Sequence, residues 1–189
     1  MERSHPRRGR CVGLAQPHPC DELPAPISTS CAFNRTLWAA TGNQIGREAR
    51  ALQNNGRNGN TYWAPVLNIV REPRWGRNLE TPGEDPLVVG AYARAFVSGF
   101  QTAREAPYPL QASATCKHFV ANEYEGHREG MNVLLSARDL VDTYLVPFQD
   151  CVEEGKASGI MCAYNVSLAR SSAHPKRSPQ RHTHLHPTL

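Results

Sequence analysis

Apolar residues recur at helical spacing near the start of the chain's middle part. In "FNRTLWAATGNQIGREARALQNNG", Trp38, Ile45 and Leu52 lie on one face of a helix of 3.6 residues per turn. Asn34 precedes this pattern and is a preferred N-cap residue, while Gly56 follows its end. The pattern therefore predicts a helix from about residue 35 to residue 55.

Two more segments are predicted to be helical. "EDPLVVGAYARAFVSGFQ" opens with Asp85 as N-cap and Pro86 at the first helical position. "SARDLVDTYLVPFQDCVEEG" opens with a capping-box pattern of Ser136 and Asp139. Pro147 is expected to kink this last helix or to mark a joint between two helices.

Three short apolar segments between these helices are predicted to be strands: "TYWAPVLNIV" (61–70), "ASATCKHFVA" (112–121) and "ASGIMCAY" (157–164). The order is thus α-β-α-β-α-β, with connections long enough for parallel strands. Three strands cannot close an eight-stranded barrel, which takes roughly 250 residues. The fold class is α/β, either a small open sheet or a segment of a larger barrel.

The two ends of the chain differ from the middle. Residues 1–26 and 166–189 are rich in Pro, Arg, His and Ser, show no periodicity, and are predicted to be unstructured. Residues 1–10 carry a net charge of +3 and residues 168–189 one of +4. Since the whole chain carries +4, the body of the chain, residues 11–167, carries −3. A mildly acidic body argues against nucleic acid as a partner. No segment approaches the ~20 apolar residues of a membrane span, and we expect no signal peptide.

The six cysteines show neither a CxxC pair nor zinc-finger spacing. Cys116, Cys151 and Cys162 have apolar neighbours in the sequence, and we interpret them as small buried hydrophobic residues. The redox compartment stays open at this point.

Polar side chains follow each predicted strand, at the edge where parallel α/β proteins place their sites. They are Arg71, Arg74, Trp75, Arg77 and Glu80 after the first strand, Lys117 and His118 at the end of the second, and Tyr164 and Asn165 at the end of the third. Such a set suits a ligand rich in hydroxyl groups or negative charge.

Lys117 and His118 are adjacent, and adjacent side chains of a regular strand face opposite sides. Both can reach one ligand only if the backbone is irregular there; otherwise one of them faces solvent or a helix. Among the carboxylates, Asp85 is explained as a helix cap, and Glu123 and Glu125 are expected in a solvated loop. Glu80 is the best placed, but a retaining glycosidase needs two carboxyl groups.

Several motifs together resemble a known family. "TYWAPVLNIVREPRWGRNLETPGEDP", "CKHFVANEYEG", "SARDLVDTYLVPFQDCV" and "GIMCAYN" are similar, in this order, to the N-terminal (β/α)8-barrel domain of glycoside hydrolase family 3, in its β-xylosidase and β-glucosidase-like branch. The resemblance implies part of such a barrel, over residues 27–165, in a retaining exo-β-glycosidase that acts on β-linked glucosides or xylosides. It implies no metal and no organic cofactor.

The resemblance also implies roles for individual residues. Arg77, Lys117 and His118 match residues that grip the sugar in the −1 subsite, and Tyr164 matches an aromatic hydroxyl beside the nucleophile. Glu80, Glu84 and Asp85 match a motif that braces the loop through salt bridges and a helix cap.

The sequence departs from the family pattern at both ends. After "MCAYN" the family continues to a strand whose "SD" aspartate is the nucleophile, but from Val166 on this sequence contains no such motif. The acid/base glutamate, which belongs to a later domain, and an acidic sugar-binding residue upstream also have no counterpart. We therefore expect the 189-residue chain to be an inactive fragment. The alternatives are a non-catalytic sugar-binding remnant or a chain without stable fold or function. A full-length family member would be extracellular.

Overall fold

The computed structural model describes residues 23–103 and 109–170, with side chains described up to residue 165. This part of the chain contains five strands, which pair in parallel, together with helices and helical turns. The elements are α1 (Pro26–Ser30), α2 (Arg35–Asn54), β1 (Thr61–Tyr62), the short turn η1 (Asn78–Glu80), α3 (Pro86–Gln101), β2 (Ser113–Phe119), β3 (Asn132–Ser136), the consecutive helical segments α4 (Ala137–Asp139), η2 (Leu140–Tyr144), α5 (Val146–Gln149) and η3 (Asp150–Glu154), β4 (Gly159–Cys162) and β5 (Val166–Arg170).

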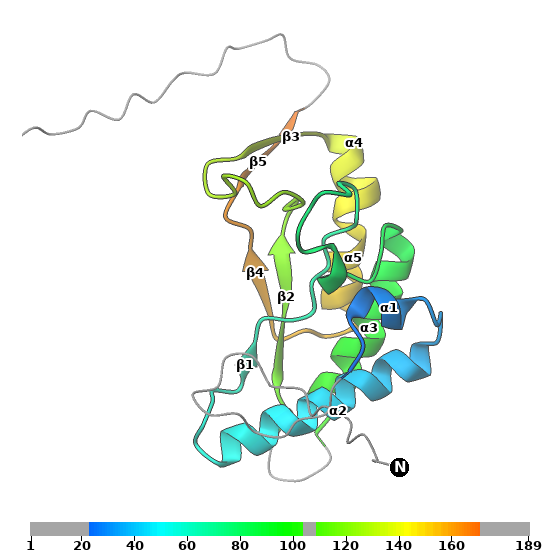
Figure 1. Cartoon of the computed structure of the whole chain (residues 1–189), viewed down its shortest axis with the longest axis vertical. Coiled ribbons are helices and arrows are strands. Elements are labelled where there is room, and N and C mark those ends of the chain that lie inside the picture. Colours follow the sequence, from blue (N-terminus) through cyan, green and yellow to red (C-terminus); the bar gives the residue numbers. More distant parts are fainter. Residues whose placement is uncertain (1–22, 104–108, 171–189) are drawn as a thin grey trace, which may run out of the picture.

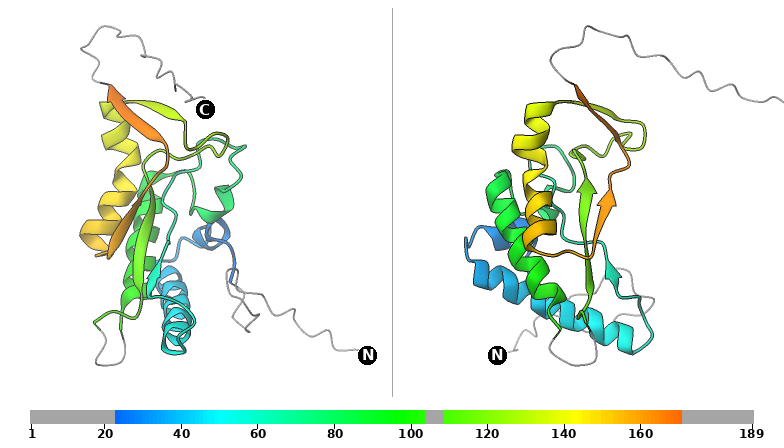
Figure 2. Two further views of the ribbon diagram at one scale, coloured as in Figure 1. Left: turned by 90° about the vertical axis from the view of Figure 1, so that its left-hand side faces the viewer. Right: turned by 180° about the vertical axis from the view of Figure 1, so that it is seen from behind.

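The main sheet has the order β1-β2-β4, and all its strands are parallel. Figure 1 shows these strands on one side of the molecule and α3 and α5 on the other, and Figure 2 shows the same layers from two further sides. The carboxyl ends of the three strands therefore lie at one edge of the sheet. This confirms the predicted α/β class and the parallel connections.

The first predicted strand is only partly regular. β1 covers Thr61 and Tyr62, and Val66 forms an isolated bridge to Lys117. The chain between them still runs along β2, because Thr115 N–H donates to Ala64 O at 3.1 Å and Lys117 N–H donates to Pro65 O at 3.0 Å. Pro65 has no N–H to return, which interrupts the regular ladder.

The last predicted helix is present but irregular. Wide π-type turns, η2 and η3, flank the single α-helical turn of α5, which contains Pro147. The ring of a proline and its missing N–H disturb the usual hydrogen bond to the fourth preceding residue. The predicted disturbance at Pro147 is therefore found as a change of helix type around it.

A second, two-stranded sheet was not predicted. β3 and β5 pair in parallel, with Asn132 opposite Val166 and Ser136 opposite Arg170. Residues 166–170 thus form a strand where the sequence predicted the start of an unstructured tail, because pairing with β3 supplies hydrogen bonds that local composition does not reveal. The predicted unstructured residues 1–22 and 171–189 lie outside the described part of the chain.

The core is built around α3. Tyr92, Phe96 and Phe100 stack along the helix, with ring centroids 5.6 and 5.9 Å apart, and all three are buried. α2 crosses α3 closely: a Cβ atom on Gly42 would collide with the backbone of Phe96, and one on Gly99 would collide with the backbone of Ala39. Glycine is the residue that permits this close backbone approach.

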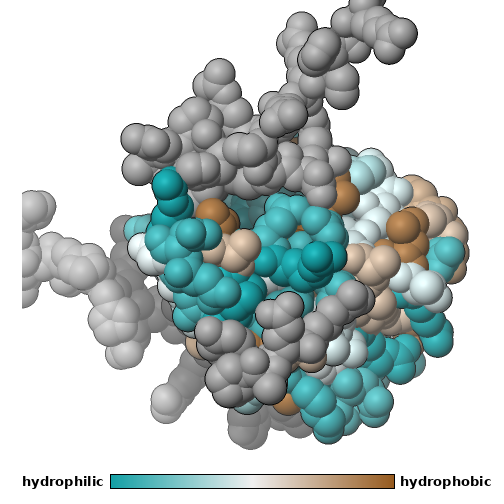
Figure 3. All heavy atoms as spheres, turned by 90° about the horizontal axis from the view of Figure 1, so that it is seen from below, coloured by the Kyte–Doolittle hydropathy of each residue, from teal (hydrophilic) through white to brown (hydrophobic). Residues whose placement is uncertain are grey.

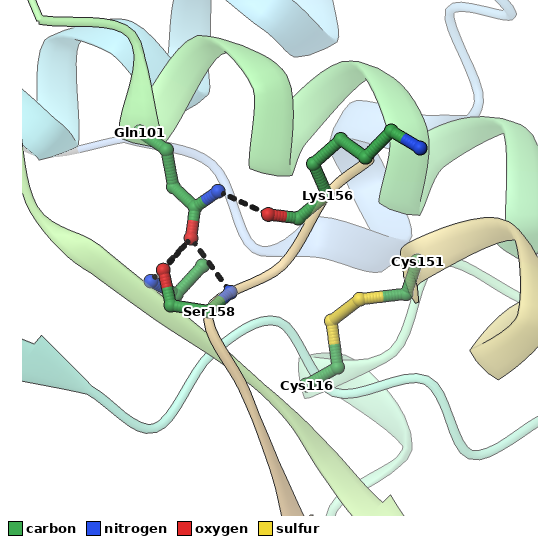
Figure 4. The surroundings of a disulfide bond; sticks show 6 residues. Gln101, Cys116, Cys151, Lys156 and Ser158 are labelled. Atoms are coloured by element: carbon green, nitrogen blue, oxygen red, sulfur yellow. Dashed lines mark hydrogen bonds between the residues drawn. A yellow bond between two sulfur atoms is a disulfide. The ribbon is translucent and has the colours of Figure 1, made fainter. Parts of the chain in front are cut away.

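Two links fasten this helical layer to the sheet (Figure 4). A disulfide joins Cys116 on β2 to Cys151 on η3. Both cysteines are buried as predicted, but they are bonded to each other, whereas Cys162 is an exposed free thiol rather than a buried residue. Burial alternates along β4, and Cys162 falls on an exposed position of this short strand.

The second link is the buried carboxamide of Gln101 at the end of α3. Its Oε1 accepts from the N–H of Ala114 on β2 at 3.1 Å, and from the N–H and the hydroxyl of Ser158 at 3.0 and 2.6 Å. Its Nε2 donates to Lys156 O at 2.8 Å. One side chain thus satisfies backbone groups of β2 and of the segment that leads into β4.

The surface at the end where α2 lies is mixed in character. Figure 3 views the end at which α2 lies, opposite the carboxyl ends of the strands; hydrophilic residues surround its centre, and hydrophobic residues form separate patches. Within residues 23–103 and 109–170, no helix combines the length and the apolar character needed to cross a bilayer.

We expect Gln101→Met to lower the free energy of unfolding by about 2–4 kcal/mol, because it leaves buried N–H and C=O groups without partners. Urea denaturation measures this difference. Gln149→Met is the matched control, since Gln149 is exposed and its carboxamide donates, among the described residues, to Glu153 alone. Equal effects of the two substitutions would show that the Gln101 link does not hold the sheet.

Candidate sugar-binding site

The candidate site lies where the chain after β1 meets the carboxyl end of β2. Leu67 N–H donates to Lys117 O at 2.7 Å, which holds the two segments together. From there the chain passes through buried Trp75 into η1, whose start is marked by Arg77. Parallel pairing therefore brings Arg77, Glu80, Lys117 and His118 into one cluster, as the sequence predicted.

Three side chains surround the guanidinium of Arg77. Its Nε and Nη2 donate to the two carboxylate oxygens of Glu80 at 2.8 and 2.6 Å, a bidentate arrangement. Its Nη1 lies 3.1 Å from Nε2 of His118 and 3.7 Å from Oε1 of Glu125. Glu80 thus braces the loop by orienting the arginine directly.

His118 is a bulge in β2. Lys117 pairs with Met161 and Phe119 pairs with Cys162, so the residue between them has no partner on β4. The Lys117–His118 peptide bond is cis. A bulge re-aims a side chain and breaks the alternation of a strand. The irregularity that the adjacent pair required is therefore present at this position.

The side chain of Asn68 takes over the hydrogen bonds that the bulge leaves. Its Oδ1 accepts from the backbone N–H of His118 at 2.9 Å, and its Nδ2 donates to His118 O at 3.0 Å. The same Oδ1 lies 3.1 Å from Nδ1 of the His118 ring. Asn68 and His118 are each 3% exposed, so this contact is shielded from water.

A second chain of contacts runs from Arg77 across the site. Glu125 accepts from the indole N–H of Trp75 at 3.2 Å and from Nη1 of Arg128 at 3.0 Å. The guanidinium of Arg128 in turn lies over the ring of Tyr164, 5.1 Å from its centroid. Tyr164, about half exposed, is thus connected to the cluster through Arg128 and Glu125.

Burial and the neighbouring charges shift the pKa values of several groups in the cluster. The hydrogen bonds from Arg77 hold the pKa of Glu80 below its ordinary value, so this carboxylate stays ionised. Burial, followed by the charge of Arg77, lowers the pKa of Lys117, and burial lowers the pKa of His118 to about 4. The basic side chains of the cluster are Arg77, Lys117 and Arg128, and they lie among the carboxyl groups of Glu80 and Glu125, beside an imidazole that is neutral near pH 7.

Other predicted residues lie apart from this cluster. Arg74 is exposed and pairs with Glu72, and Arg71 lies over the ring of Tyr144. Asp85 caps α3 as predicted, accepting from the N–H groups of Leu87 and Val88. Glu84 was expected to brace the loop. It is exposed, borders a pocket of about 380 Å³ beside α1, and has no ion pair or hydrogen bond among the described residues.

The expectation of a solvated loop for Glu123 and Glu125 is wrong. Glu125 is part of the cluster, and Glu123 accepts from the hydroxyl of Tyr144 at 3.3 Å, with its Oε1 buried and without a partner among the described residues. Burial raises the pKa of Glu123 to about 7, against the opposing influence of Arg71 and Tyr144. Packing against η2 takes this side chain out of water, which loop composition could not reveal.

Sequence reasoning did not single out Asn68 and Arg128. The only signal for Asn68 was a polar residue inside an otherwise apolar run. Arg128 was hidden in a charged segment whose order in space depends on Glu125 and Tyr164. No group of three or more His, Cys, Asp or Glu side chains suited to a metal ion occurs among residues 23–103 and 109–170. The cluster offers N–H donors and carboxylate oxygens of the kind that bind sugar hydroxyls.

A parallel (β/α) barrel places its active site at the carboxyl ends of its strands, which is where this cluster lies. The family described as "Glycosyl hydrolase family 3 N terminal domain" matches residues 17–179. The chain therefore belongs to glycoside hydrolase family 3. This confirms the resemblance on which the site residues were chosen.

Curated relatives and solved structures agree with this assignment. Over 76% of the chain, it is 47% identical to the probable β-D-xylosidase 7 and 45% identical to the β-D-xylosidase 1 of Arabidopsis thaliana. A family 3 exo-β-xylosidase in complex with a xylobiose aziridine probe matches 78% of the chain with a TM-score of 0.74 and 30% identity. The β-glucosidase 3B of Thermotoga neapolitana, in complex with glucose, matches with a TM-score of 0.66 and 32% identity.

The chain spans only about a fifth of these relatives: 20% and 19% of the two Arabidopsis proteins, and 20% and 19% of the two solved chains. It thus represents part of the N-terminal barrel domain, as predicted.

We expect Glu123→Gln to stabilise the chain above pH 7. The folded-state pKa of about 7 exceeds the ordinary 4.5. The free energy of unfolding of the wild type therefore falls as the pH rises from about 4.5 through 7. Glutamine carries no charge to desolvate and should gain about 2–3 kcal/mol at pH 8 but little at pH 5. Urea denaturation at both pH values measures this gain. Glu129→Gln, in the same loop and exposed, is the control; a gain independent of pH would contradict the assignment.

Proposed function

We propose that this chain supplies the sugar-gripping part of a retaining exo-β-glycosidase of the β-xylosidase or β-glucosidase type. The carrying observation is the Arg77–Glu80–His118 cluster beside Lys117, at the carboxyl ends of parallel strands. Arg77 and Arg128 are paired with the carboxylates of Glu80 and Glu125 within the cluster, which favours a neutral polyhydroxylated ligand over an anionic one. Arg77 and Lys117 donate to sugar hydroxyls, and Glu80 keeps the arginine in place.

The relatives support a β-xyloside or β-glucoside as the substrate of the parent enzyme, since they are named β-xylosidases and β-glucosidases. Hydrolysis with retention requires a nucleophile and an acid/base group about 5–5.5 Å apart. Glu80 is engaged with Arg77, and Glu125 with Trp75 and Arg128, so neither is placed to attack a sugar. The role proposed for these 189 residues is therefore binding without bond cleavage.

We expect the purified chain to bind xylose or glucose saturably, and to show no turnover of aryl β-xylosides or β-glucosides. Calorimetry and release of the aryl alcohol measure the two properties. Arg77→Ala should weaken binding at least about tenfold, the loss of more than one charge-assisted hydrogen bond. The control Arg74→Ala should leave affinity unchanged, because Arg74 pairs only with Glu72. Turnover by the pure chain would overturn the absence of bond cleavage, and absence of any binding would overturn the sugar-binding role.

We also propose that the protein works in an oxidising compartment outside the cell, as expected for a full-length family member. The disulfide between Cys116 and Cys151 supports this, since disulfides persist in oxidising environments and are rare in the cytosol. Thiol alkylation of protein isolated from its source, without reductant, should leave Cys116 and Cys151 unmodified and label the exposed Cys162. Labelling of Cys116 or Cys151 would argue for a reducing compartment.

A further inference from the structure

We propose that Asn68 is a positioning residue of this site, which fixes His118 as the tautomer protonated at Nδ1, so that Nε2 is a hydrogen-bond acceptor facing Arg77. The effect on sugar affinity rests on the proposed sugar-binding function, whereas the fixing of the His118 tautomer does not depend on it. Asn68 acts through His118 rather than by contacting the sugar itself.

The orientation of the Asn68 carboxamide follows from the backbone of the bulge. Its oxygen faces the N–H of His118 at 2.9 Å, and its nitrogen faces the carbonyl of the same residue at 3.0 Å. Turning the amide over would set two donors against each other and two acceptors against each other. The atom 3.1 Å from the ring Nδ1 is therefore an oxygen, and Nδ1 must carry the proton that it accepts.

The opposite side of the ring requires the same tautomer. Nε2 lies 3.1 Å from Nη1 of Arg77, and a guanidinium can only donate. A proton on Nε2 would point at this donor. The two neighbours, Asn68 on one side and Arg77 on the other, thus select one of the three protonation states of the imidazole.

The surrounding charges agree with a neutral ring. Arg77 and Lys117 disfavour a proton on His118, Glu80 and Glu125 favour one, and burial outweighs them all by lowering the pKa. His118 therefore turns its Nε2 lone pair toward Arg77 and adds no positive charge to the site. The consequence for ligand selection is that the ring orients the Arg77 guanidinium and cannot itself pair with an anion.

Sequence position alone would assign Asn68 another role. As a buried residue that closes a bulge, it could simply hold β2 to the chain before η1. Such a role predicts that its replacement changes stability alone. The positioning role predicts a change in the proton positions of His118 and in sugar affinity among molecules that are still folded.

The test uses the ring nitrogen resonances of His118 in the full 189-residue chain, assigned by their loss in His118→Gln. In the wild type at pH 7 we expect a protonated Nδ1 and an unprotonated Nε2, which have different ¹⁵N chemical shifts. A proton on Nε2 overturns the proposal without any need for an Asn68 variant.

Asn68→Asp then tests the cause. The aspartate keeps an acceptor for Nδ1–H but adds a negative charge, so the pKa of His118 should rise from about 4 by about 1–3 units. At pH values below this raised pKa, the sugar affinity of Asn68→Asp should be at least about tenfold lower than that of the wild type, because the ring then turns a second N–H toward Arg77. The control is Asn58→Asp, an exposed asparagine before β1 at the other end of the strands, which should change neither value.

The outcomes separate this proposal from the proposed function. If the wild type binds no sugar but His118 shows the expected tautomer and the shifted pKa in Asn68→Asp, the sugar-binding function fails and the fixing of His118 by Asn68 stands. If the wild type binds sugar and folded Asn68→Asp binds it equally well below the raised pKa of His118, the positioning role is wrong. If Asn68→Asp does not fold, Asn68→Ser provides the comparison, and an unchanged tautomer in it contradicts the role of the carboxamide.

Discussion

The parallel pairing of β2 with a neighbour on each side determines where everything else in this molecule lies. β1 and the chain after it run along one edge of β2, and β4 runs along the other. Because all of these run in one direction, the segments that follow them emerge at one edge. Arg77, Lys117 and Tyr164 are far apart in sequence and come to that edge for this reason alone.

The helical layer keeps β2 in place rather than building the site itself. Gln101 binds backbone groups of β2 and of the segment before β4, and the Cys116–Cys151 disulfide lies one residue before Lys117. These few bonds connect the end of α3 and the helical layer to β2, next to the first residues of the cluster. Loss of either link is expected to disturb the geometry of the site, although neither link contacts a ligand.

Much of this fold could be predicted from sequence because its signals are local. Asn34, Asp85 and Pro86 mark the starts of α2 and α3, and both helices begin where these residues place them. The π-type turns around Pro147 were foreseen only as a disturbance, since the type of turn depends on packing. β5 was missed because it depends on β3, which is about 30 residues away in sequence.

The site was predictable as a set of residues but not as a network. Motif resemblance selected Arg77, Lys117 and His118, and the strand order explains why they meet. Two of their partners, Asn68 and Glu125, act through particular atoms: Oδ1 of Asn68 lies 2.9 Å from N and 3.1 Å from Nδ1 of His118, and Oε1 of Glu125 lies 3.7 Å from Nη1 of Arg77. Only the arrangement in space shows which oxygen faces which nitrogen. For the same reason, the sequence could not show that the charged loop segment "NEYEGHREG" is part of a site rather than solvated surface.

The close crossing of α2 and α3 has a consequence for inherited variation. Gly42, Gly46 and Gly99 lie where any side chain, even a methyl group, would meet the backbone of the facing helix. Each codon at these positions is one nucleotide change away from alanine, serine or a larger residue. Damaging alleles of this gene are therefore expected at small, chemically unremarkable residues far from the sugar, as well as among the charged residues that hold it.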